Sequence, residues 1–305
     1  MPVKRSKTSI TELISTILVP TDFSKGADQA LERALTLPLR DGAVVHLLHV
    51  KAKSLIDSEQ RAVQAVAMKD AVAHARLLVK ELGLNVLIAS KVVTGRSYEE
   101  IVRQSHKLGA ELIVMGRHGH QPLRDMFMGS TADRIIRYGT LPVLLVNGPA
   151  HQAYGHPIAA VDFGETTGQT LRALLRVVGP AVAEVALVHA YHVPFEGLTS
   201  PSPSTEETSY RMFAREQAVQ KSTAALASLP QWGVSWRTFF VNGDARGAAL
   251  SEAQTQQADL IALGTHARSG LSHVLLGSVA EWIAAAAHCD VLIVRPTRFT
   301  FQPLT

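Results

Sequence analysis

The sequence carries one short pattern twice, and this repeat is the strongest constraint on its fold. Gly-Arg-His-Gly at residues 116–119 is followed, nine residues on, by Gly-Ser at residues 129–130. The second copy reads Gly-Thr-His-Ala at residues 264–267 and Gly-Ser at residues 277–278. Positions 116 and 264, and positions 129 and 277, are each 148 residues apart. A constant offset of this kind predicts a tandem duplication of one structural unit.

Each half alternates apolar, β-branched runs with amphipathic stretches. We expect strands near residues 16–21, 43–50, 86–93, 111–115, 142–146, 157–162, 184–190, 234–241, 259–263 and 291–294. We expect helices near residues 24–39, 57–82, 97–108, 130–138, 166–178, 206–229, 246–257 and 278–287. The strand candidates are continuously apolar, which is typical of parallel strands covered on both faces.

This order predicts an α/β protein with two tandem, doubly wound, Rossmann-like domains. Each is expected to hold a five-stranded, mainly parallel sheet and four helices. The first domain is expected to cover residues 1–148 and the second residues 149–305, because the segment at 147–156 breaks the pattern. Ser24 and Ser97 are the expected N-caps of their helices, with Glu100 completing a capping box after Ser97.

The second half is longer than the first. Asp22, after the first strand, precedes Gly116 by 94 residues, whereas its counterpart Asp162 precedes Gly264 by 102 residues. The net insertion of eight residues is expected within residues 194–209, as a surface loop rich in proline and serine.

Composition excludes several classes of protein. The net charge is only +4 and no dense Lys/Arg stripe is present, so we expect no nucleic-acid partner. No apolar run reaches the ~18–20 residues needed to cross a bilayer, so we expect no membrane association. Cys289 is the only cysteine and cannot form an intrachain disulfide. We therefore expect a cytoplasmic protein with Cys289 as a buried, inert thiol.

The repeated pattern indicates a phosphate site. Glycines allow positive φ and a close approach of the backbone to a ligand. Gly129-Ser130 opens a helix, where free N–H groups and the helix dipole attract anions. Ser130 and Thr131 add hydroxyl groups, and Arg117 or Arg124 could add positive charge. Asp22 lies at the carboxyl end of the first strand, where it can accept from a ribose hydroxyl or a base amine, or can simply cap the next helix.

These residues resemble the nucleotide-binding branch of the universal stress proteins, which carries Gly-x2-Gly-x9-Gly-(Ser/Thr). The resemblance covers nearly the whole chain, once per half. It implies ATP binding, with or without Mg²⁺. It assigns to the adenine and ribose side Pro20, Thr21, Asp22 and Val50, and to the phosphate side Met115, Gly116, His118, Gly119, Gly129, Ser130 and Thr131. The matching positions in the second half are Val161, Asp162, Ala190, Leu263, Gly264, His266, Ala267, Gly277, Ser278 and Val279.

The second copy departs from the pattern at Ala267, which stands where the first has Gly119. If that position needs positive φ, alanine costs about 1–2 kcal/mol there. A difference of 1.4 kcal/mol is tenfold in affinity. We therefore expect a weaker second site, unless the position has negative φ and tolerates alanine.

The residues do not predict an enzyme. Lys25 lacks the P-loop arrangement, and no nucleophile–base pair is evident. His46 and His49 fall on opposite faces of a strand, so we expect no metal site there. The leading hypothesis is an ATP-binding stress-response or regulatory protein with at most slow hydrolysis. The alternatives are a nucleotide-independent interaction or scaffold protein and, third, a nucleotide-dependent enzyme of related topology.

The last strand of each half predicts how the halves assemble. Residues 142–146 and 291–294 are apolar edge candidates, and an uncovered apolar edge invites pairing. The family resemblance implies dimers joined through this strand. In a tandem chain the two halves can pair with each other as a pseudo-dimer, and we also expect a homodimer of the whole chain.

Overall fold

The computed structural model describes residues 13–52, 58–117, 128–150, 152–191, 205–230, 232–265 and 276–296. The elements of the first half are β1 (Ile14–Pro20), α1 (Lys25–Thr36), β2 (Leu39–Lys51), α2 (Ser58–Glu81), β3 (Val86–Thr94), α3 (Ser97–Lys107), β4 (Leu112–Gly116), α4 (Ser130–Tyr138) and β5 (Val143–Val146). Those of the second half are β6 (Pro157–Ala160), α5 (Thr167–Val178), β7 (Glu184–Tyr191), α6 (Thr205–Ala227), β8 (Ser235–Asn242), α7 (Ala245–Thr255), β9 (Leu260–Gly264), α8 (Ser278–Ala286) and β10 (Asp290–Val294). Every predicted strand and helix is present, with ends displaced by a few residues.

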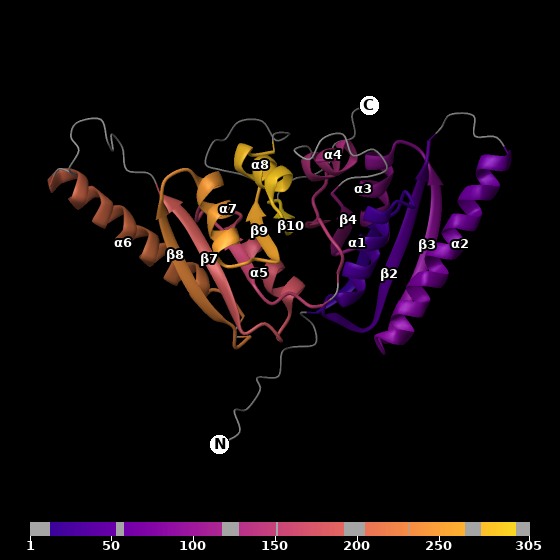
Figure 1. The fold of residues 1–305 in the computed structure, drawn as a ribbon, viewed down its shortest axis with the longest axis horizontal. Coiled ribbons are helices and arrows are strands. Elements are labelled where there is room, and N and C mark those ends of the chain that lie inside the picture. Colours follow the sequence, from indigo (N-terminus) through magenta and orange to yellow (C-terminus); the bar gives the residue numbers. More distant parts are fainter. Residues whose placement is uncertain are drawn as a thin grey trace, which may run out of the picture.

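The ten strands form one continuous sheet in the order β3-β2-β1-β4-β5-β10-β9-β6-β7-β8 (Figure 1). Neighbouring strands within each half are parallel. The halves join through β5 and β10, which pair antiparallel with Leu144 opposite Leu292. The predicted pseudo-dimer through the last strands is therefore confirmed. Each apolar edge covers the other.

Both faces of the sheet are covered by helices. On β1, Ile17 and Val19 contribute to the core under α1, α2, α5 and α6, whereas Leu18 contributes to the core under α3, α4, α7 and α8. Both cores extend across the two halves. Because alternate residues of a strand point to opposite faces, a strand buried on both faces must be apolar throughout. This explains the continuous apolar runs in the sequence.

Polar contacts fasten the halves to each other beside the strand pairing. Asp290, at the start of β10, is buried and accepts hydrogen bonds from the backbone of Asn147 at 2.8 Å and the hydroxyl of Tyr154 at 2.6 Å. Its other neighbour is Arg33 of α1, whose Nε lies 2.9 Å from the carboxylate. A second ion pair joins Arg176 of α5 to Glu111 of the first half. The interface therefore combines an apolar strand pair with one buried and one partly exposed ion pair.

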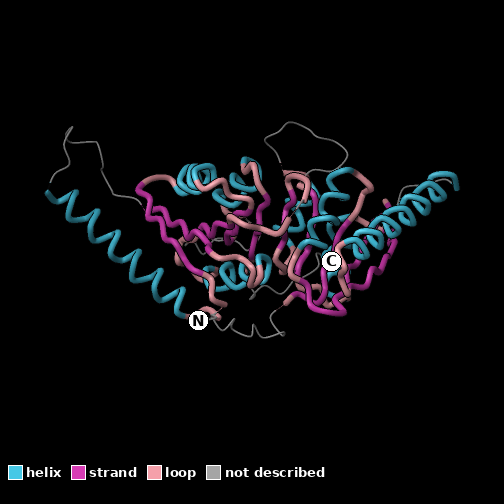
Figure 2. The backbone as a smooth tube through the Cα atoms, turned by 60° about the horizontal axis from the view of Figure 1, so that its bottom comes forward, coloured by secondary structure: helices cyan, strands magenta, loops and turns pink. Residues whose placement is uncertain are grey.

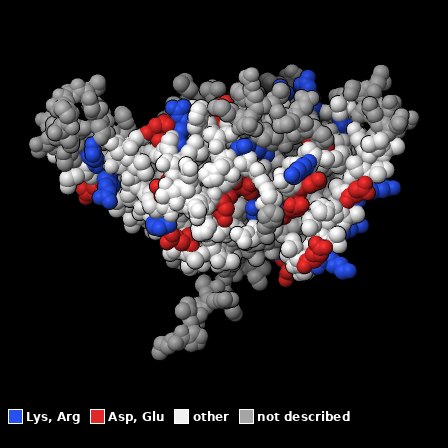
Figure 3. All heavy atoms as spheres, viewed as in Figure 1, with Lys and Arg blue, Asp and Glu red and all other residues white. Residues whose placement is uncertain are grey.

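The longest helices, α2 and α6, lie at opposite ends of the molecule (Figures 1 and 2). The insertion predicted at residues 194–209 lies outside the described residues as far as residue 204. Its last part is helical rather than a loop, because α6 already begins at Thr205. In the part of the chain that the structure describes, no helix is long and apolar enough to cross a membrane. On the face seen in Figure 3, acidic and basic side chains are interspersed.

Candidate functional site

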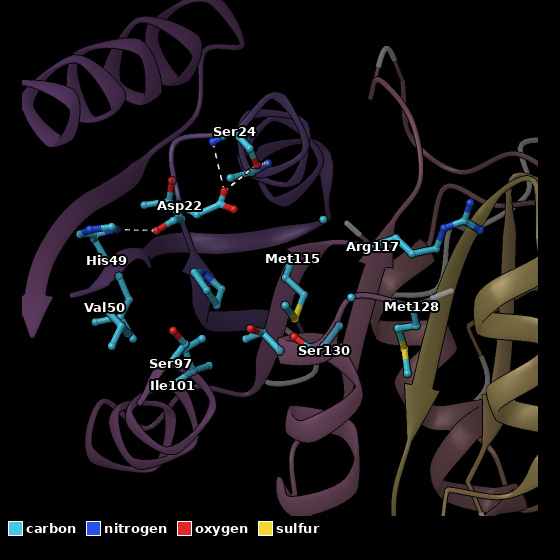
Figure 4. A pocket seen from close by; sticks show the side chains of 18 residues that line it. Asp22, Ser24, His49, Val50, Ser97, Ile101, Met115, Arg117, Met128 and Ser130 are labelled. Carbon is cyan, nitrogen blue, oxygen red and sulfur yellow. Dashed lines mark hydrogen bonds between the residues drawn. The ribbon is translucent and has the colours of Figure 1, made fainter. Parts of the chain in front are cut away.

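A pocket of about 520 Å³ opens at the carboxyl ends of β1, β2 and β4. The N-termini of α1, α3 and α4 form its other walls (Figure 4). The pocket brings together all the described residues predicted for the first site: Pro20, Thr21, Asp22, Val50, Met115, Gly116, Gly129, Ser130 and Thr131. His118 and Gly119, also predicted for this site, lie outside the described residues. The carboxyl edge of a parallel sheet is the usual place for a ligand.

Asp22 lies in the turn between β1 and α1. Its Oδ1 accepts from the backbone N–H of Ser24 at 3.1 Å and from the hydroxyl of Ser24 at 2.5 Å. The Ser24 hydroxyl oxygen in turn accepts from the backbone N–H of Ala27. The prediction of Ser24 as N-cap is thus confirmed. Asp22 orients that cap while it also lines the pocket.

His49 is a pocket residue that the sequence argument considered only as a metal candidate. Its Nδ1 lies 2.9 Å from the backbone carbonyl oxygen of Thr21. A carbonyl only accepts, so Nδ1 carries the hydrogen and Nε2 of the neutral ring is an acceptor. Nε2 is buried and has no hydrogen-bond partner among the described residues. The signal in the sequence was its counterpart His189, which has the same offset from His49 as Asp162 has from Asp22.

The motif glycines at positions 116, 264 and 277 are required by close packing and not by positive φ. Neither Gly129 nor Gly277, with φ of −57° and −58°, is left-handed, and Gly116 and Gly264 are not among the residues with positive φ. Of the two properties of glycine considered from the sequence, positive φ is therefore not the one used at these four positions. A Cβ at position 116 would lie 2.8 Å from the carbonyl oxygen of Gly26, and the backbone of α1 leaves no room for it.

The N-terminus of α4 faces the pocket with no side-chain cap. Asp133 donates the first backbone bond of the helix, to the carbonyl oxygen of Gly129. The N–H groups of Ser130 and Thr131 therefore have no acceptor within the helix. Together with the helix dipole and the two hydroxyl groups, they can bind an anion. Gly129 itself donates to the carbonyl oxygen of Arg117 and closes the base of the intervening segment.

Arg117, which the sequence suggested as a phosphate ligand, does not point into the pocket. Its guanidinium Nη1 donates to the carbonyl oxygen of Ala287 in the second half, at 2.7 Å. Figure 4 shows the side chain pointing out of the pocket in that direction. Arg124, the other suggested cation, lies outside the described residues. Among those that are described, no group of three or more His, Cys, Asp or Glu side chains could hold a metal ion.

The prediction of Ser97 as N-cap is wrong. The N-cap of α3 is Arg96, which has an extended backbone and makes no capping hydrogen bond, and Ser97 is the first helical residue. Asp244 has the equivalent place before α7, where its carboxylate accepts from the N–H groups of Arg246 and Gly247. Ser97 lines the pocket instead.

The second half forms a smaller pocket, of about 180 Å³, at the equivalent place. It brings together eight predicted residues: Val161, Asp162, Ala190, Leu263, Gly264, Gly277, Ser278 and Val279. His266 and Ala267 lie outside the described residues. The turn chemistry is repeated, because Asp162 accepts from the N–H of Gly164 at 2.7 Å and the Nδ1 of His189 lies 2.8 Å from the carbonyl oxygen of Val161.

The fold and the paired pockets define a tandem α/β protein with a pocket at the equivalent place in each half. The family model described as "Universal stress protein family" matches residues 14–147 and 154–295. The chain therefore belongs to the universal stress protein family. The predicted fold, two tandem Rossmann-like domains, is confirmed.

Some relatives match about half of this chain, and others match nearly all of it. A universal stress protein of Methanocaldococcus jannaschii is 29% identical over 162 residues, covering 52% of this chain and 92% of its own. Universal stress protein E of Escherichia coli is 23% identical, covering 93% of this chain and 94% of its own. A solved universal stress protein from Archaeoglobus fulgidus has 16% identity and a TM-score of 0.69, covering 94% of this chain and 98% of its own. At that identity, the solved structure supports the fold alone.

Proposed function

We propose that this protein binds an adenine nucleotide in the first pocket and that occupancy sets a conformation or a partner surface, with at most slow hydrolysis. The observation that carries the proposal is the convergence of Asp22 and the open N-terminus of α4 on one pocket. Its volume of about 520 Å³ falls within the ~300–1,000 Å³ common for small-molecule sites.

The polar groups that line the pocket support a nucleotide as the ligand, because each could meet a different part of it. Asp22 can accept a hydrogen bond from a ribose hydroxyl, and the ring of His49 lines the pocket beside it while its Nδ1 holds the carbonyl of Thr21 in place. Ser130 and Thr131 offer hydroxyl and backbone N–H donors to phosphate oxygens. Val50, Ile101 and Met115 supply apolar wall for a base. Mg²⁺, if it accompanies ATP, would be held chiefly by the phosphates.

The regulatory part of the proposal follows from the position of the pocket. Gly116 and Arg117 end the strand β4 beside β5, and Arg117 bonds across to the second half. A ligand that orders this corner therefore acts next to the contact between the halves. One universal stress protein has been solved in complex with cAMP. It matches 44% of this chain at 20% identity with a TM-score of 0.35, so the choice of nucleotide here rests on the pocket.

Calorimetric titration with ATP, ADP and AMP tests the proposal. The variants Asp22→Asn and Ser130→Ala should weaken binding by about tenfold each, the worth of roughly one hydrogen bond. Their counterparts Asp162→Asn and Ser278→Ala are matched controls in the second half and should leave the tight site unchanged. A folded protein that binds none of the three nucleotides would refute the proposal.

The second candidate, nucleotide-independent binding of a partner protein, is favoured by one surface. Tyr210, Met212 and Phe213 of α6 are exposed, by 47%, 69% and 58%. Exposed apolar side chains that gather on one helix mark interaction surfaces. This candidate predicts that Asp22→Asn and Ser130→Ala have no effect in cells, whereas polar substitutions at the three apolar positions do.

A further inference from the structure

The second pocket is smaller than the first, although most of the side chains that line it are smaller. The second pocket has about a third of the volume of the first. Yet its walls carry smaller side chains at many paired positions: Ala160 for Pro20, Val188 for Leu48, Ala190 for Val50, Ala245 for Ser97 and Ala249 for Ile101. These substitutions alone would widen it. Something else fills the space.

Among the described residues, the added side chains come from the start of α5. Thr166, Thr167 and Thr170 line the second pocket where the first half has Gly26, Ala27 and Ala30. Among the described lining residues, these are the positions at which the second half clearly has the larger side chain, since Val161 and Val279 are nearly isosteric with Thr21 and Thr131. All three threonines are buried.

The pairing of Gly26 with Thr166 is supported by packing and not by numbering alone. A Cβ added to Gly116 would meet the backbone of Gly26. A Cβ added to Gly264 would meet the side chain of Thr166 and would lie 2.9 Å from the Cβ of Thr166. The two motif glycines thus contact equivalent points. In the first half that point is bare backbone, and in the second half it carries a hydroxyl and a methyl group.

We infer that Thr166, assisted by Thr170, is the specificity determinant that confines nucleotide binding to the first half. This inference rests on the proposed function. The side chain of Thr166 lies beside Gly264, at the end of β9, where the pocket meets the N-terminus of α8. The Thr170 hydroxyl donates to the carbonyl oxygen of Thr166 at 3.0 Å and holds that turn in place. The close-packed α5 leaves these groups no room to withdraw.

This inference differs from the expectation based on Ala267. That expectation attributes a weak second site to the loss of a motif glycine. The structure offers a separate cause in the wall formed by α5, and the two causes can be distinguished by substitution.

The experiment counts nucleotides bound per chain by calorimetry in four proteins: the natural chain, Thr166→Gly/Thr170→Ala, Ala267→Gly, and Gly26→Thr/Ala30→Thr. The inference expects about one nucleotide in the natural chain, about two in the threonine variant, about one in Ala267→Gly, and none in the last. Adding Asp22→Asn and Ser130→Ala to the threonine variant locates the new site, which should survive that change. Near-UV circular dichroism and urea unfolding establish that each variant is folded.

The outcomes separate the inference from the proposed function. Two nucleotides in the natural chain, one in the threonine variant, or two in Ala267→Gly would each overturn the inference while leaving nucleotide binding intact. None in the natural chain and one in the threonine variant would refute the first site and support the threonine barrier. None in either protein would refute both.

Discussion

Phe163 adopts in the second half the left-handed backbone conformation that Phe23 adopts in the first, with φ of 57° and 64°. Each ring packs on a histidine, His189 or His49, with ring centroids 4.5 Å apart. Left-handed backbone costs a bulky residue about 1–2 kcal/mol, and such strain persists where the surroundings fix it. Here the ring contact fixes the turn that contains Asp22, so the strain lies at the edge of the site in both halves.

We predict that His49→Phe weakens nucleotide binding by about tenfold, since the ring contact with Phe23 is kept but the hydrogen bond from Nδ1 to the carbonyl of Thr21, which fixes the turn before Asp22, is lost. His189→Phe is the matched control. Each variant leaves a carbonyl without its partner and should lose about 1–3 kcal/mol of unfolding free energy. Only His49→Phe should change affinity in a titration. Equal affinities in the two variants would mean that His49 does not contribute to nucleotide binding.

Gly116→Ala should be destabilising because its Cβ would lie 2.8 Å from the carbonyl oxygen of Gly26. Over-packing of this kind costs about 1–3 kcal/mol, and nucleotide binding should fall with it. The control is Gly148→Ala, where an added Cβ has nothing within 4 Å. Urea unfolding measures both. If the two variants were equally stable, the close approach of α1 to β4 would not be needed.

Arg33→Ala should be the most destabilising single change at the contact between the halves. Arg33 and Asp290 are both buried, with 9% and 6% of their side chains exposed. Removing one partner of a buried pair costs about 3–5 kcal/mol. Arg237→Ala, which breaks the exposed pair with Glu184, should cost less than about 1 kcal/mol. Denaturant midpoints compare them, and a loss at Arg33 as small as that at Arg237 would contradict this account.

Glu111 should make stability depend on acid pH. Partial burial would raise its pKa, but hydrogen bonds from Ser15 and the Arg176 guanidinium outweigh burial and hold the pKa of Glu111 below its usual 4.5. A carboxyl with a lowered folded pKa stabilises above its unfolded pKa and loses that contribution as pH falls through the folded pKa. Glu111→Gln should therefore be less stable than the natural chain at neutral pH, with the difference closing below pH 4.5. A difference that stays constant across that window would rule out this linkage.

Cys289 should be unreactive in the folded protein. Burial, with Asp290 and Asp259 nearby, raises the pKa of its thiol to about 12. Because the thiolate is the nucleophile, modification by a disulfide reagent at pH 8 should be slow until the chain unfolds. The labelling rate, measured with and without urea, checks this. Rapid labelling without urea would mean that the segment before β10 opens readily.

The strands, the helices and most of the first site could be predicted from the sequence because their causes are local. Continuous apolar runs and helical periodicity fix the elements, and topology brings the carboxyl ends of parallel strands to one edge. Asp22, Gly116 and Ser130 were therefore predictable from their places after a strand or before a helix. Ser97 was misassigned by one residue, since helix ends depend on the backbone of the preceding turn.

Other features needed the tertiary structure. The tautomer and burial of His49 depend on the carbonyl of Thr21, and the close approach of Gly26 to Gly116 depends on how α1 crosses β4. Neither pairing is visible as a sequence pattern, because the partners are tens of residues apart. Arg117 was suggested as a phosphate ligand, but the carbonyl of Ala287, in the other half, fixes its direction.

The sequence by itself determined that the chain is a duplicated α/β unit with a glycine-bearing motif in each copy. A repeat at constant offset and an alternation of strands and helices can both be read along the chain without knowing its contacts. Only the tertiary structure decided how the copies differ. The side chain of Thr166 narrows one pocket because packing places it against Gly264, where the other half has the bare backbone of Gly26. Volume is set by contacts between distant segments, and a close-packed interior leaves little freedom to compensate.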